Sequence, residues 1–251
     1  MTLDIDAELA AGARLMWVAA HPDDEFLTGA LLARARLVHN TPVHICIMTR
    51  GSGGGNPIVA ADLGATRAGE MQAVADRLGA TLEVHDYWNA PLPFSSFPSR
   101  PELYRRWQAQ GDPQADIAAS IRAFAPDIVL TFDPDFGATG HPEHTLVSRL
   151  TTSAVRSLSA ETRPRLVLHA LRRHWAFRLM RQADPGPVDA WFDGGLPCVD
   201  GKTCQQTLVE LTLLHATQAG DLAPFRRFSR LFQPLGLRVV DVDTRIDLPE
   251  A

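Results

Sequence analysis

The chain has 251 residues, of which 45% are hydrophobic and 21% are charged. This length and composition exclude a disordered chain, a collagen and a coiled coil, and they suffice for one domain with a sizeable core. The 24 Lys and Arg residues against 29 Asp and Glu residues give a formal net charge of −5. Because binding to nucleic acid or to an anionic membrane needs clustered excess positive charge, we expect neither and predict a small-molecule partner.

The cysteines and the N-terminal stretch indicate a cytoplasmic protein. Cys46, Cys198 and Cys204 are odd in number and lack Cys-x-x-Cys spacing, which is typical of reduced thiols. The N-terminal stretch is acidic and has no basic region before an apolar run, and no later run reaches ~18 consecutive apolar residues. We therefore expect no signal peptide and no membrane span. The sequence leaves homo-oligomerisation open.

Short apolar runs alternate with amphipathic stretches along the first half of the chain, which is typical of a parallel sheet covered by helices. The apolar runs predict strands at residues 15–20, 43–49, 81–84, 128–132, 165–171 and 237–248. The amphipathic stretches predict helices at residues 26–38, around 71–78, 117–124, 146–158 and 203–217. A glycine-rich turn at residues 51–57 follows the second strand. With no repeat or linker in between, these elements indicate one α/β domain covering residues 1–251.

Residues 86–113 hold many of the prolines and aromatic side chains of the chain. A long irregular segment inside a compact domain is usually a functional loop or a lid. We therefore expect this segment to be a loop that shapes the mouth of a pocket.

Several common sites are excluded by inspection. The glycine-rich turn is not a dinucleotide-binding loop, because Asn56 stands where Gly-x-Gly-x-x-Gly requires its last glycine. The Gly-Lys-Thr at residues 201–203 is not a P-loop, because Leu196 stands at the position of the first glycine. No Gly-x-Ser-x-Gly motif is present, and a Schiff base would depend on Lys202, the only lysine.

Metal-ligating side chains concentrate at two places. The first, His21-Pro22-Asp23-Asp24-Glu25, comes directly after the first predicted strand, and the second, His141-Pro142-Glu143-His144, lies between the fourth strand and a predicted helix. Ligands of open α/β sheets bind beyond the carboxyl ends of the strands. If the two strands are neighbours, both motifs therefore face the same crevice and together hold one metal ion.

The chemistry of a catalytic zinc ion requires three protein ligands and a fourth position for water, and two histidines with one carboxylate meet that count. A second carboxylate can accept the proton of the water, and a further histidine can stabilise an oxyanion or protonate an amine. Taken singly, each motif has a structural alternative, since a lone histidine often caps a helix and Asp23 or Asp24 can do the same. Their joint occurrence favours the metal site, with Fe²⁺ as an alternative occupant.

The remaining titratable groups are expected to be structural. The six other histidines are each isolated in the sequence: His39, His44, His85, His169, His174 and His215. A run of arginines can bind an anionic group, but a solvated face is the simpler interpretation. These arginines are Arg163, Arg165, Arg172, Arg173, Arg178 and Arg181.

The motifs Ala-His-Pro-Asp-Asp-Glu and Gly-His-Pro-Glu-His resemble those of the zinc-dependent N-deacetylases of the PIG-L/LmbE-like family, which includes the sugar deacetylases of mycothiol and bacillithiol synthesis. The resemblance extends to a Thr-x-Gly turn at residues 49–51, to Arg67 and Glu70 in an Arg-x-x-Glu pattern, and to His-Ala-Thr-Gln at residues 215–218. Together these motifs cover most of the chain in the family's order.

The resemblance implies a Rossmann-like, mostly parallel sheet with helices on both faces. It implies zinc held by His21, Asp24 and His144, with Asp23 as general base and His141 as electrostatic or acid partner. Arg67 is expected in the substrate pocket. The implied reaction is the attack of metal-activated water on an acetamide carbonyl, which removes the N-acetyl group from an N-acetylglucosamine-containing small conjugate.

Four departures from the family pattern bear on the substrate. Ser52 replaces a frequent glutamate, Asn89 an aspartate that often contacts sugar hydroxyls, and Thr139 a tyrosine found in some mycothiol-pathway members, whereas Glu143 replaces the usual aspartate of His-Pro-Asp-His. We include Asn89 among the expected substrate-binding residues. An amidase for a bulkier sugar or thiol-conjugate amide is the enzyme alternative, and a metal- or sugar-binding module without turnover is the non-enzyme alternative.

Overall fold

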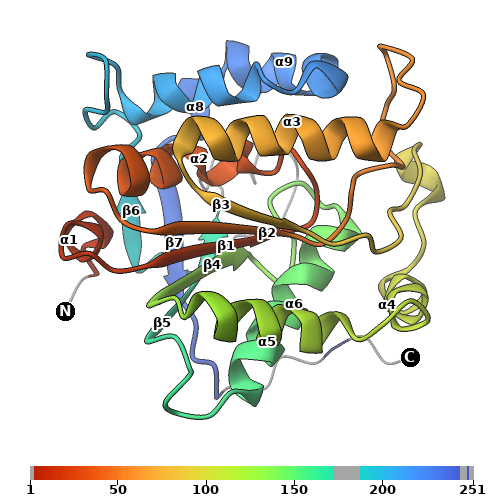
Figure 1. Ribbon diagram of the computed structural model, residues 1–251, viewed down its shortest axis with the longest axis horizontal. Helices are drawn as coiled ribbons and strands as arrows, with labels where there is room; N and C mark the ends of the chain where they lie inside the picture. Colours follow the sequence, from red (N-terminus) through yellow and green to blue (C-terminus); the bar gives the residue numbers. More distant parts are fainter. Residues whose placement is uncertain (1–2, 172–186, 244–247, 249–251) are drawn as a thin grey trace.

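The computed structural model describes residues 3–171, 187–243 and 248, and a seven-stranded sheet forms its centre (Figure 1). The strands are β1 (Leu15–Ala19), β2 (Val43–Ile47), β3 (Thr81–Val84), β4 (Ile128–Phe132), β5 (Leu166–Leu171), β6 (Ala190–Phe192) and β7 (Leu235–Val239). Their order in the sheet is β3-β2-β1-β4-β5-β7-β6. The first five strands run parallel, while β7 is antiparallel to both β5 and β6.

Helices cover both faces of this sheet, as Figure 1 shows, so the expected doubly covered α/β architecture is confirmed. One face carries α2 (Glu25–Ala33), α3 (Leu63–Leu78), α8 (Cys204–Thr212) and α9 (Ala219–Arg227). The other carries α4 (Arg100–Gln108), α5 (Pro113–Phe124) and α6 (Pro142–Ser157), and α1 (Ile5–Ala10) lies at the β6 side. Short helical turns complete the chain at residues 34–38, 94–96, 216–218 and 229–232.

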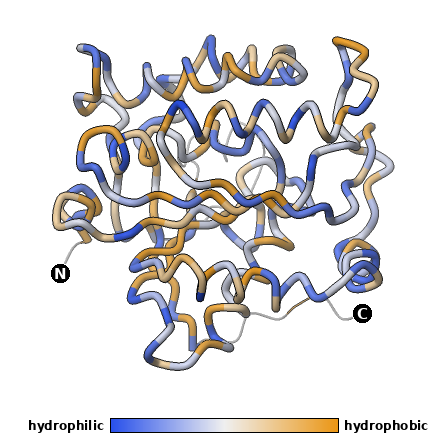
Figure 2. The backbone as a smooth tube through the Cα atoms, viewed as in Figure 1, coloured by the Kyte–Doolittle hydropathy of each residue, from blue (hydrophilic) through white to orange (hydrophobic). Residues whose placement is uncertain are grey.

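The central strands are buried on both faces because helices cover both sides. Every residue of β1 and of β4 is buried, and the run of apolar residues appears as the orange centre of the tube in Figure 2. Such continuous apolar runs are typical of parallel strands with both faces covered. Trp17 on β1 packs edge-to-face against Phe132 on β4, with ring centroids 5.0 Å apart. The residues that follow β1 and β4 therefore leave a rigid core.

The strand order reverses between β1 and β4, because the chain continues from β1 outward to β2 and later returns on the other side with β4. The two strands pair directly, with Leu15 opposite Ile128 and Trp17 opposite Leu130. Ligand crevices of open α/β sheets form at such a reversal, beyond the carboxyl ends of the strands. This pairing confirms the condition under which the two histidine motifs meet.

The segment 86–113 is not the continuous loop that its prolines suggest. It contains α4, which begins after the N-cap Ser99, carries Pro101 in its first turn and buries Leu103 and Trp107 on one side. Proline is favoured in the first turn of a helix, so the same residue that resembles a loop signal helps the helix begin. Residues 89–97 have no regular structure besides the short turn at 94–96, and several of them line a cavity described below.

The C-terminal third differs most from the expectation. The predicted strand at residues 237–248 is shorter and starts earlier, since β7 ends at Val239 and a turn follows in which the Asp243 amide donates to Asp241 Oδ1 at 3.1 Å. Aspartates that bond to the local backbone favour turns over strands. The helix predicted at 203–217 ends at Thr212, and α1, β6 and α9 are elements that the periodicity analysis missed.

Other expectations have mixed outcomes. All three cysteines are free thiols. Of the arginine run, Arg163 pairs with Asp243 and Arg165 with Glu8, whereas Arg172, Arg173, Arg178, Arg181 and the isolated His174 lie outside the described residues. Within the described ranges, no helix has the length and apolar character needed to cross a bilayer.

Candidate active site

The first histidine motif forms the connection between β1 and α2. Asp24 stands at the N-cap position of α2, but its side chain does not cap the helix. Instead its Oδ2 accepts hydrogen bonds from the amides of Ala20, at 3.0 Å, and His21, at 2.7 Å. This turns Oδ1 toward His144 Nε2, which lies 3.0 Å away. The structural alternative, in which Asp24 serves as an ordinary cap, therefore does not describe this residue.

The second motif opens α6. His141 is the N-cap of this helix, and its Nδ1 accepts a hydrogen bond from the Glu143 amide at 3.2 Å. His144, one turn later, has its Nδ1 2.7 Å from the Gly137 carbonyl oxygen and 3.0 Å from Thr139 Oγ1. Since a carbonyl only accepts, Nδ1 of His144 carries a proton, and Nε2 is the ring nitrogen turned away from this carbonyl. This Nε2 faces the first motif.

Glu143 holds the ring of His21 and is a residue whose role the sequence analysis missed. It is fully buried, and its Oε2 forms a short contact with His21 Nε2. The same carboxylate accepts the Asn89 side-chain amide at 2.7 Å and the Ala90 backbone amide at 2.6 Å. A carboxylate on the distal nitrogen is the usual means of orienting a metal-binding imidazole. The replacement of aspartate by glutamate in the second motif was the available signal.

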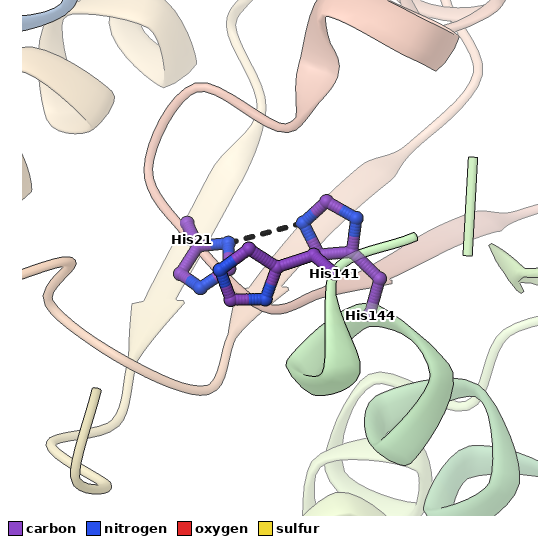
Figure 3. Close-up of side chains that lie close together, drawn as sticks. All are labelled: His21, His141 and His144. Carbon is purple, nitrogen blue, oxygen red and sulfur yellow. Dashed lines mark hydrogen bonds between the residues drawn. The ribbon is translucent and has the colours of Figure 1, made fainter. Parts of the chain in front are cut away.

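Three donor atoms thus point at one place, and Figure 3 shows the histidine rings converging from the two motifs. His21 Nδ1 lies 3.1 Å from His144 Nε2 and 3.5 Å from the carboxylate of Asp24, and His144 Nε2 lies 3.0 Å from Asp24 Oδ1. Ligands at ~2.0–2.1 Å in a tetrahedral zinc site are about 3.3 Å apart. Two imidazoles and one carboxylate at this spacing could hold a divalent metal ion. Nitrogens of His141 also lie within 4.8 Å of those of His21 and His144, so this ring borders the same place.

The charges of the cluster perturb its pKa values strongly. Burial acts to lower the pKa of His21, but the carboxylates of Asp24 and Glu143 outweigh it and raise the pKa to about 10. Burial acts to raise the pKa of Asp24, yet the neighbouring His144 and His21 hold it well below the usual range. Burial, together with the nearby His21 and His144, lowers the pKa of His141, so this ring stays neutral. The cluster therefore combines an ionised carboxylate with a neutral histidine.

Asp23 stands apart from the three donor atoms and pairs with an arginine. Its Oδ1 lies 3.0 Å from Nη2 of Arg67, a side chain that is 4% exposed. Burial raises the pKa of Asp23 to about 6, although the Arg67 charge opposes the shift. Its backbone has φ of 112°, a strained conformation that a surrounding structure must enforce and that clusters at functional sites. Asp23 is thus a carboxylate whose pKa lies about one unit below neutral pH.

Arg67 fixes the loop that carries Asp23. Its Nη1 donates to the Gly51 carbonyl at 2.9 Å, and its Nη2 donates to the Pro22 carbonyl at 2.5 Å. A Cβ atom at Gly51, where φ is +68°, would lie 2.5 Å from the guanidinium carbon, so only glycine fits here. The Thr-x-Gly turn and the arginine of α3 therefore act as one structural unit beneath the first motif.

The remaining family-like residues join the C-terminal third to this unit. Glu70 accepts hydrogen bonds from the Thr217 amide, at 2.8 Å, and from the Thr217 hydroxyl, at 2.5 Å. His215, which is fully buried, has its Nε2 2.7 Å from Glu25 Oε1. These contacts explain the Arg-x-x-Glu and His-x-Thr-Gln patterns as supports of the site, and they place α9 beside it.

A cavity of about 520 Å³ opens above the cluster. Its polar lining includes Asp23 and His141, for which the family resemblance implied catalytic roles. Its walls are largely apolar and come from α2, from residues 89–97 and from α9: Phe26, Leu92, Phe94, Phe97, Leu222 and Phe225. Pockets of this size and character are typical small-molecule sites.

Both expected substrate contacts line this cavity, but each is engaged by the fold. Asn89 accepts a hydrogen bond from the Gly53 amide at 2.6 Å and donates one to Glu143. Arg67 is held by Asp23 and two backbone carbonyls. Their contacts with a substrate stay predictions.

Comparison with known sequences finds the GlcNAc-PI de-N-acetylase family, PIG-L, matching residues 16–155. A curated relative from Rhodococcus opacus (strain B4), named 1D-myo-inositol 2-acetamido-2-deoxy-alpha-D-glucopyranoside deacetylase, is 34% identical over 60% of this chain and 56% of its own length. A relative of the same name from Thermobifida fusca (strain YX) is 31% identical over 70% of this chain and 69% of its own. The chain thus spans little more than half the length of several of these relatives.

Solved structures share the fold at low identity. The N,N'-diacetylchitobiose deacetylase from Pyrococcus horikoshii matches with a TM-score of 0.60 and 18% identity, over 98% of this chain and 91% of its own. The 4-carboxy-2-hydroxymuconate hydratase from Pseudomonas putida KT2440 matches with a TM-score of 0.53 and 18% identity, over 93% of this chain and 98% of its own. The same fold therefore carries more than one reaction, and function has to be inferred from the site. The match over residues 16–155, which contain both histidine motifs, shows that the chain belongs to the PIG-L family.

Proposed function

We propose that the protein is a metal-dependent hydrolase that removes the N-acetyl group from a small conjugate containing N-acetylglucosamine. The observation that carries the proposal is the convergence of His21 Nδ1, Asp24 Oδ1 and His144 Nε2 on one point at the floor of a cavity, with a separate carboxylate, Asp23, beside them. The names of the curated relatives, which are deacetylases of an acetamido sugar linked to inositol, support the substrate class.

His21, Asp24 and His144 would hold the metal, and zinc is the ion that two imidazoles and one carboxylate favour, with Fe²⁺ as the alternative. A bound zinc ion would supply Lewis-acid polarisation of the carbonyl and would lower the pKa of a water molecule to ~7. Glu143 and the Gly137 carbonyl keep the two imidazoles oriented before the metal arrives.

Asp23 is the proposed general base. With a pKa of about 6 it is ionised at neutral pH and still basic enough to accept a proton from the attacking water. The oxygen adds to the acetamide carbonyl carbon, the carbon–nitrogen bond breaks, and the proton held by Asp23 passes to the departing amine. Acetate and a free amine result. Arg67 keeps the Asp23 carboxylate in place during both proton transfers.

His141 is the proposed donor to the carbonyl oxygen. Its Nδ1 accepts the Glu143 amide, so the proton of the neutral ring lies on Nε2. The ring is half-buried and lines the cavity, and its lowered pKa keeps it from carrying a charge before the substrate binds. A neutral N–H donor aimed at the carbonyl oxygen stabilises the negative charge that develops there.

The apolar walls bear on the rest of the substrate. A free acetamido sugar is mostly polar, whereas Phe94, Phe97 and Leu222 offer apolar surface next to the polar floor. This supports a conjugate whose second part has apolar surface, seated between residues 89–97 and α9.

Amine release from a panel of substrates tests the proposal. Purified protein is incubated with free N-acetylglucosamine, with several N-acetylglucosaminyl conjugates and with bulkier sugar amides, each with chelator and with added Zn²⁺. We expect chelator-sensitive release of amine and acetate from a conjugate. Release only from the bulkier amides would replace the deacetylase with an amidase, and no release from protein that holds one equivalent of metal would favour a binding module.

A further inference from the structure

A second group of metal-ligating side chains lies away from the cavity, on the β2 and β3 edge of the sheet. Cys46 is on β2, Glu83 is on β3, and His85 follows β3 directly. Cys46 pairs with Glu83 in the register of the two strands, so both side chains point to the same face of the sheet. Ser120 of α5 donates to Glu83 Oε2 at 2.5 Å, which identifies that face as the one that α5 covers (Figure 1). We refer to Cys46, Glu83 and His85 as the edge cluster.

The ligand atoms of the edge cluster are close enough to share an ion. Cys46 Sγ, a carboxylate oxygen of Glu83 and a ring nitrogen of His85 all lie within 4.8 Å of one another. His85 Nε2 is 3.3 Å from Glu83 Oε1. His44 flanks the group, with its Nδ1 2.8 Å from Thr81 Oγ1 and its Nε2 3.6 Å from Glu83 Oε2.

One polar atom of the edge cluster lies near a carboxylate but makes no hydrogen bond to it. His85 Nε2 is shielded from solvent and has no hydrogen-bond partner among the described residues. Buried polar atoms are nearly always satisfied, and an exception calls for a missing water or ion. The neighbouring Cys46 is fully buried, and burial with the charge of Glu83 raises the pKa of its thiol, so the group is neutral until a cation displaces the proton.

We propose that Cys46, Glu83 and His85 form a second metal site, separate from the candidate active site, that binds zinc or a similar thiophilic divalent cation. Thiolate, imidazole and carboxylate are the ligand types that zinc takes in proteins, whereas Mg²⁺ and Ca²⁺ prefer oxygen ligands. The thiolate and the carboxylate balance the charge of a divalent ion. Binding exchanges the thiol proton of Cys46 for a sulfur–metal bond and releases that proton to solvent.

The site is accessible and would have a structural effect. The Glu83 side chain is 41% exposed to solvent, so an ion can reach the edge cluster from outside. The chain runs from His85 to Asn89 and Ala90, which hold Glu143 through 2.7 Å and 2.6 Å hydrogen bonds. A metal at the edge cluster would fasten the start of this segment to β2.

Cobalt spectroscopy on the full chain tests the site. Co²⁺ is added to metal-free protein under reducing conditions, and sulfur-to-cobalt charge-transfer absorption in the near ultraviolet is recorded with the bound stoichiometry. Neither histidine motif contains a cysteine, so this absorption reports only on a thiolate site. We expect two equivalents bound, one of them with the charge-transfer band, and one proton released per thiolate formed.

Variants separate the possible thiols. Cys46→Ala should abolish the band and reduce the stoichiometry from two to one, while Cys198→Ser, the matched control, should change neither. His85→Gln keeps the thiol and changes a residue nearer the surface. Loss of a residue that only orients a ligand typically weakens metal binding by ~10–100-fold. Because His85 is a proposed ligand itself, His85→Gln should weaken binding at the edge cluster by more than that. Binding of a single equivalent without the band, or a band that survives Cys46→Ala, would overturn the proposal.

Discussion

The candidate active site and the edge cluster contain similar ligands in different surroundings. In the active site the distal nitrogens of His21 and His144 are held by Glu143 and by the Gly137 carbonyl, and the cluster forms the floor of a cavity. In the edge cluster His85 Nε2 has no hydrogen-bond partner among the described residues, and none of the three side chains lines that cavity. The difference teaches that ligand chemistry alone does not indicate catalysis. A cavity, a separate base and orienting hydrogen bonds do.

The largest expected effect comes from removing that separate base. Asp23→Asn should lower kcat for amine release by ~10²–10⁴, because general base catalysis contributes about that much. Metal content should stay the same, since Asp23 is not among the three converging donors. The rate and the metal content are measured on the same preparation. Asp86→Asn, at an exposed position, serves as the control. Full activity in Asp23→Asn would show that Asp23 is not the general base, so a separate base would no longer distinguish the active site from the edge cluster.

A pair of glutamate variants sharpens the comparison through metal affinity. Glu143→Gln should weaken metal binding at the active site by ~10–100-fold, because the orienting carboxylate of His21 is lost. Glu83→Gln should weaken binding only at the edge cluster. Competition with a chromophoric chelator measures both affinities. If Glu143→Gln weakened neither site, the orienting role of Glu143 would be wrong.

A smaller effect is expected from the apolar cavity walls, which the edge cluster lacks and which we expect to bind the substrate. Phe97 packs against His141, with ring centroids 4.5 Å apart, and forms part of the cavity wall. Phe97→Ala should raise KM for a conjugate with an apolar second part by about tenfold, because the lost apolar contact is worth roughly 1–3 kcal/mol. Steady-state rates on that conjugate and on free N-acetylglucosamine measure the effect. An equal change for both substrates would show that the wall supports only His141.

A third histidine environment extends the comparison to an isolated ring. His169 on β5 is buried, and burial with the nearby Arg238 lowers its pKa to about 3. In the unfolded chain its pKa is ~6.5, so the unfolded state binds the proton more strongly between these values. The free energy of unfolding should therefore fall as the pH drops from 6.5 toward 3, by at most ~1.4 kcal/mol per pH unit from this group.

Urea unfolding at pH 7 and pH 5 measures this term in the native protein and in His169→Gln. We expect the variant to lose less stability than the native protein between the two pH values. Thr152 Oγ1 lies 3.4 Å from His169 Nε2. The side-chain amide of the glutamine in His169→Gln can still bond to this hydroxyl, so the variant leaves Thr152 with a partner. The same loss in both proteins would contradict the assignment of His169 as a buried neutral ring.

The sequence predicted the first half of the fold well because local and global signals agree there. The run Ile128–Phe132 is apolar, β-branched and bounded by a proline and an aspartate, and it forms β4 with every residue buried. In α4 the signals conflict, since Pro101 is a residue typical of loops and also one that favours the first turn of a helix. In the C-terminal third, the alternation of residues 237–248 resembled a strand, while the hydrogen bond from the Asp243 amide to the Asp241 carboxylate favours a turn after Val239.

The site was predictable in its residues but not in its contacts. The two motifs indicated a metal centre because their residue types are rare together, and the pairing of β1 with β4 brings them into contact. Glu143, the carboxylate of the second motif, showed no role in the sequence, because its partners Asn89 and Ala90 come from a segment more than fifty positions away. His85 was interpreted as isolated for the same reason. Its neighbour Cys46 is on the adjacent strand, and strand register is not visible in the sequence.

Zinc titration of a single variant tests the central claim most directly. Cys46→Ala, which removes the thiol of the edge cluster, is freed of metal, and amine release from the best conjugate is measured as Zn²⁺ is added. We predict no release without metal, a rise in rate with each increment, and a plateau at one equivalent. Undiminished release from the metal-free protein, or a rate that zinc does not restore, would contradict the assignment of His21, Asp24 and His144 as a catalytic metal centre.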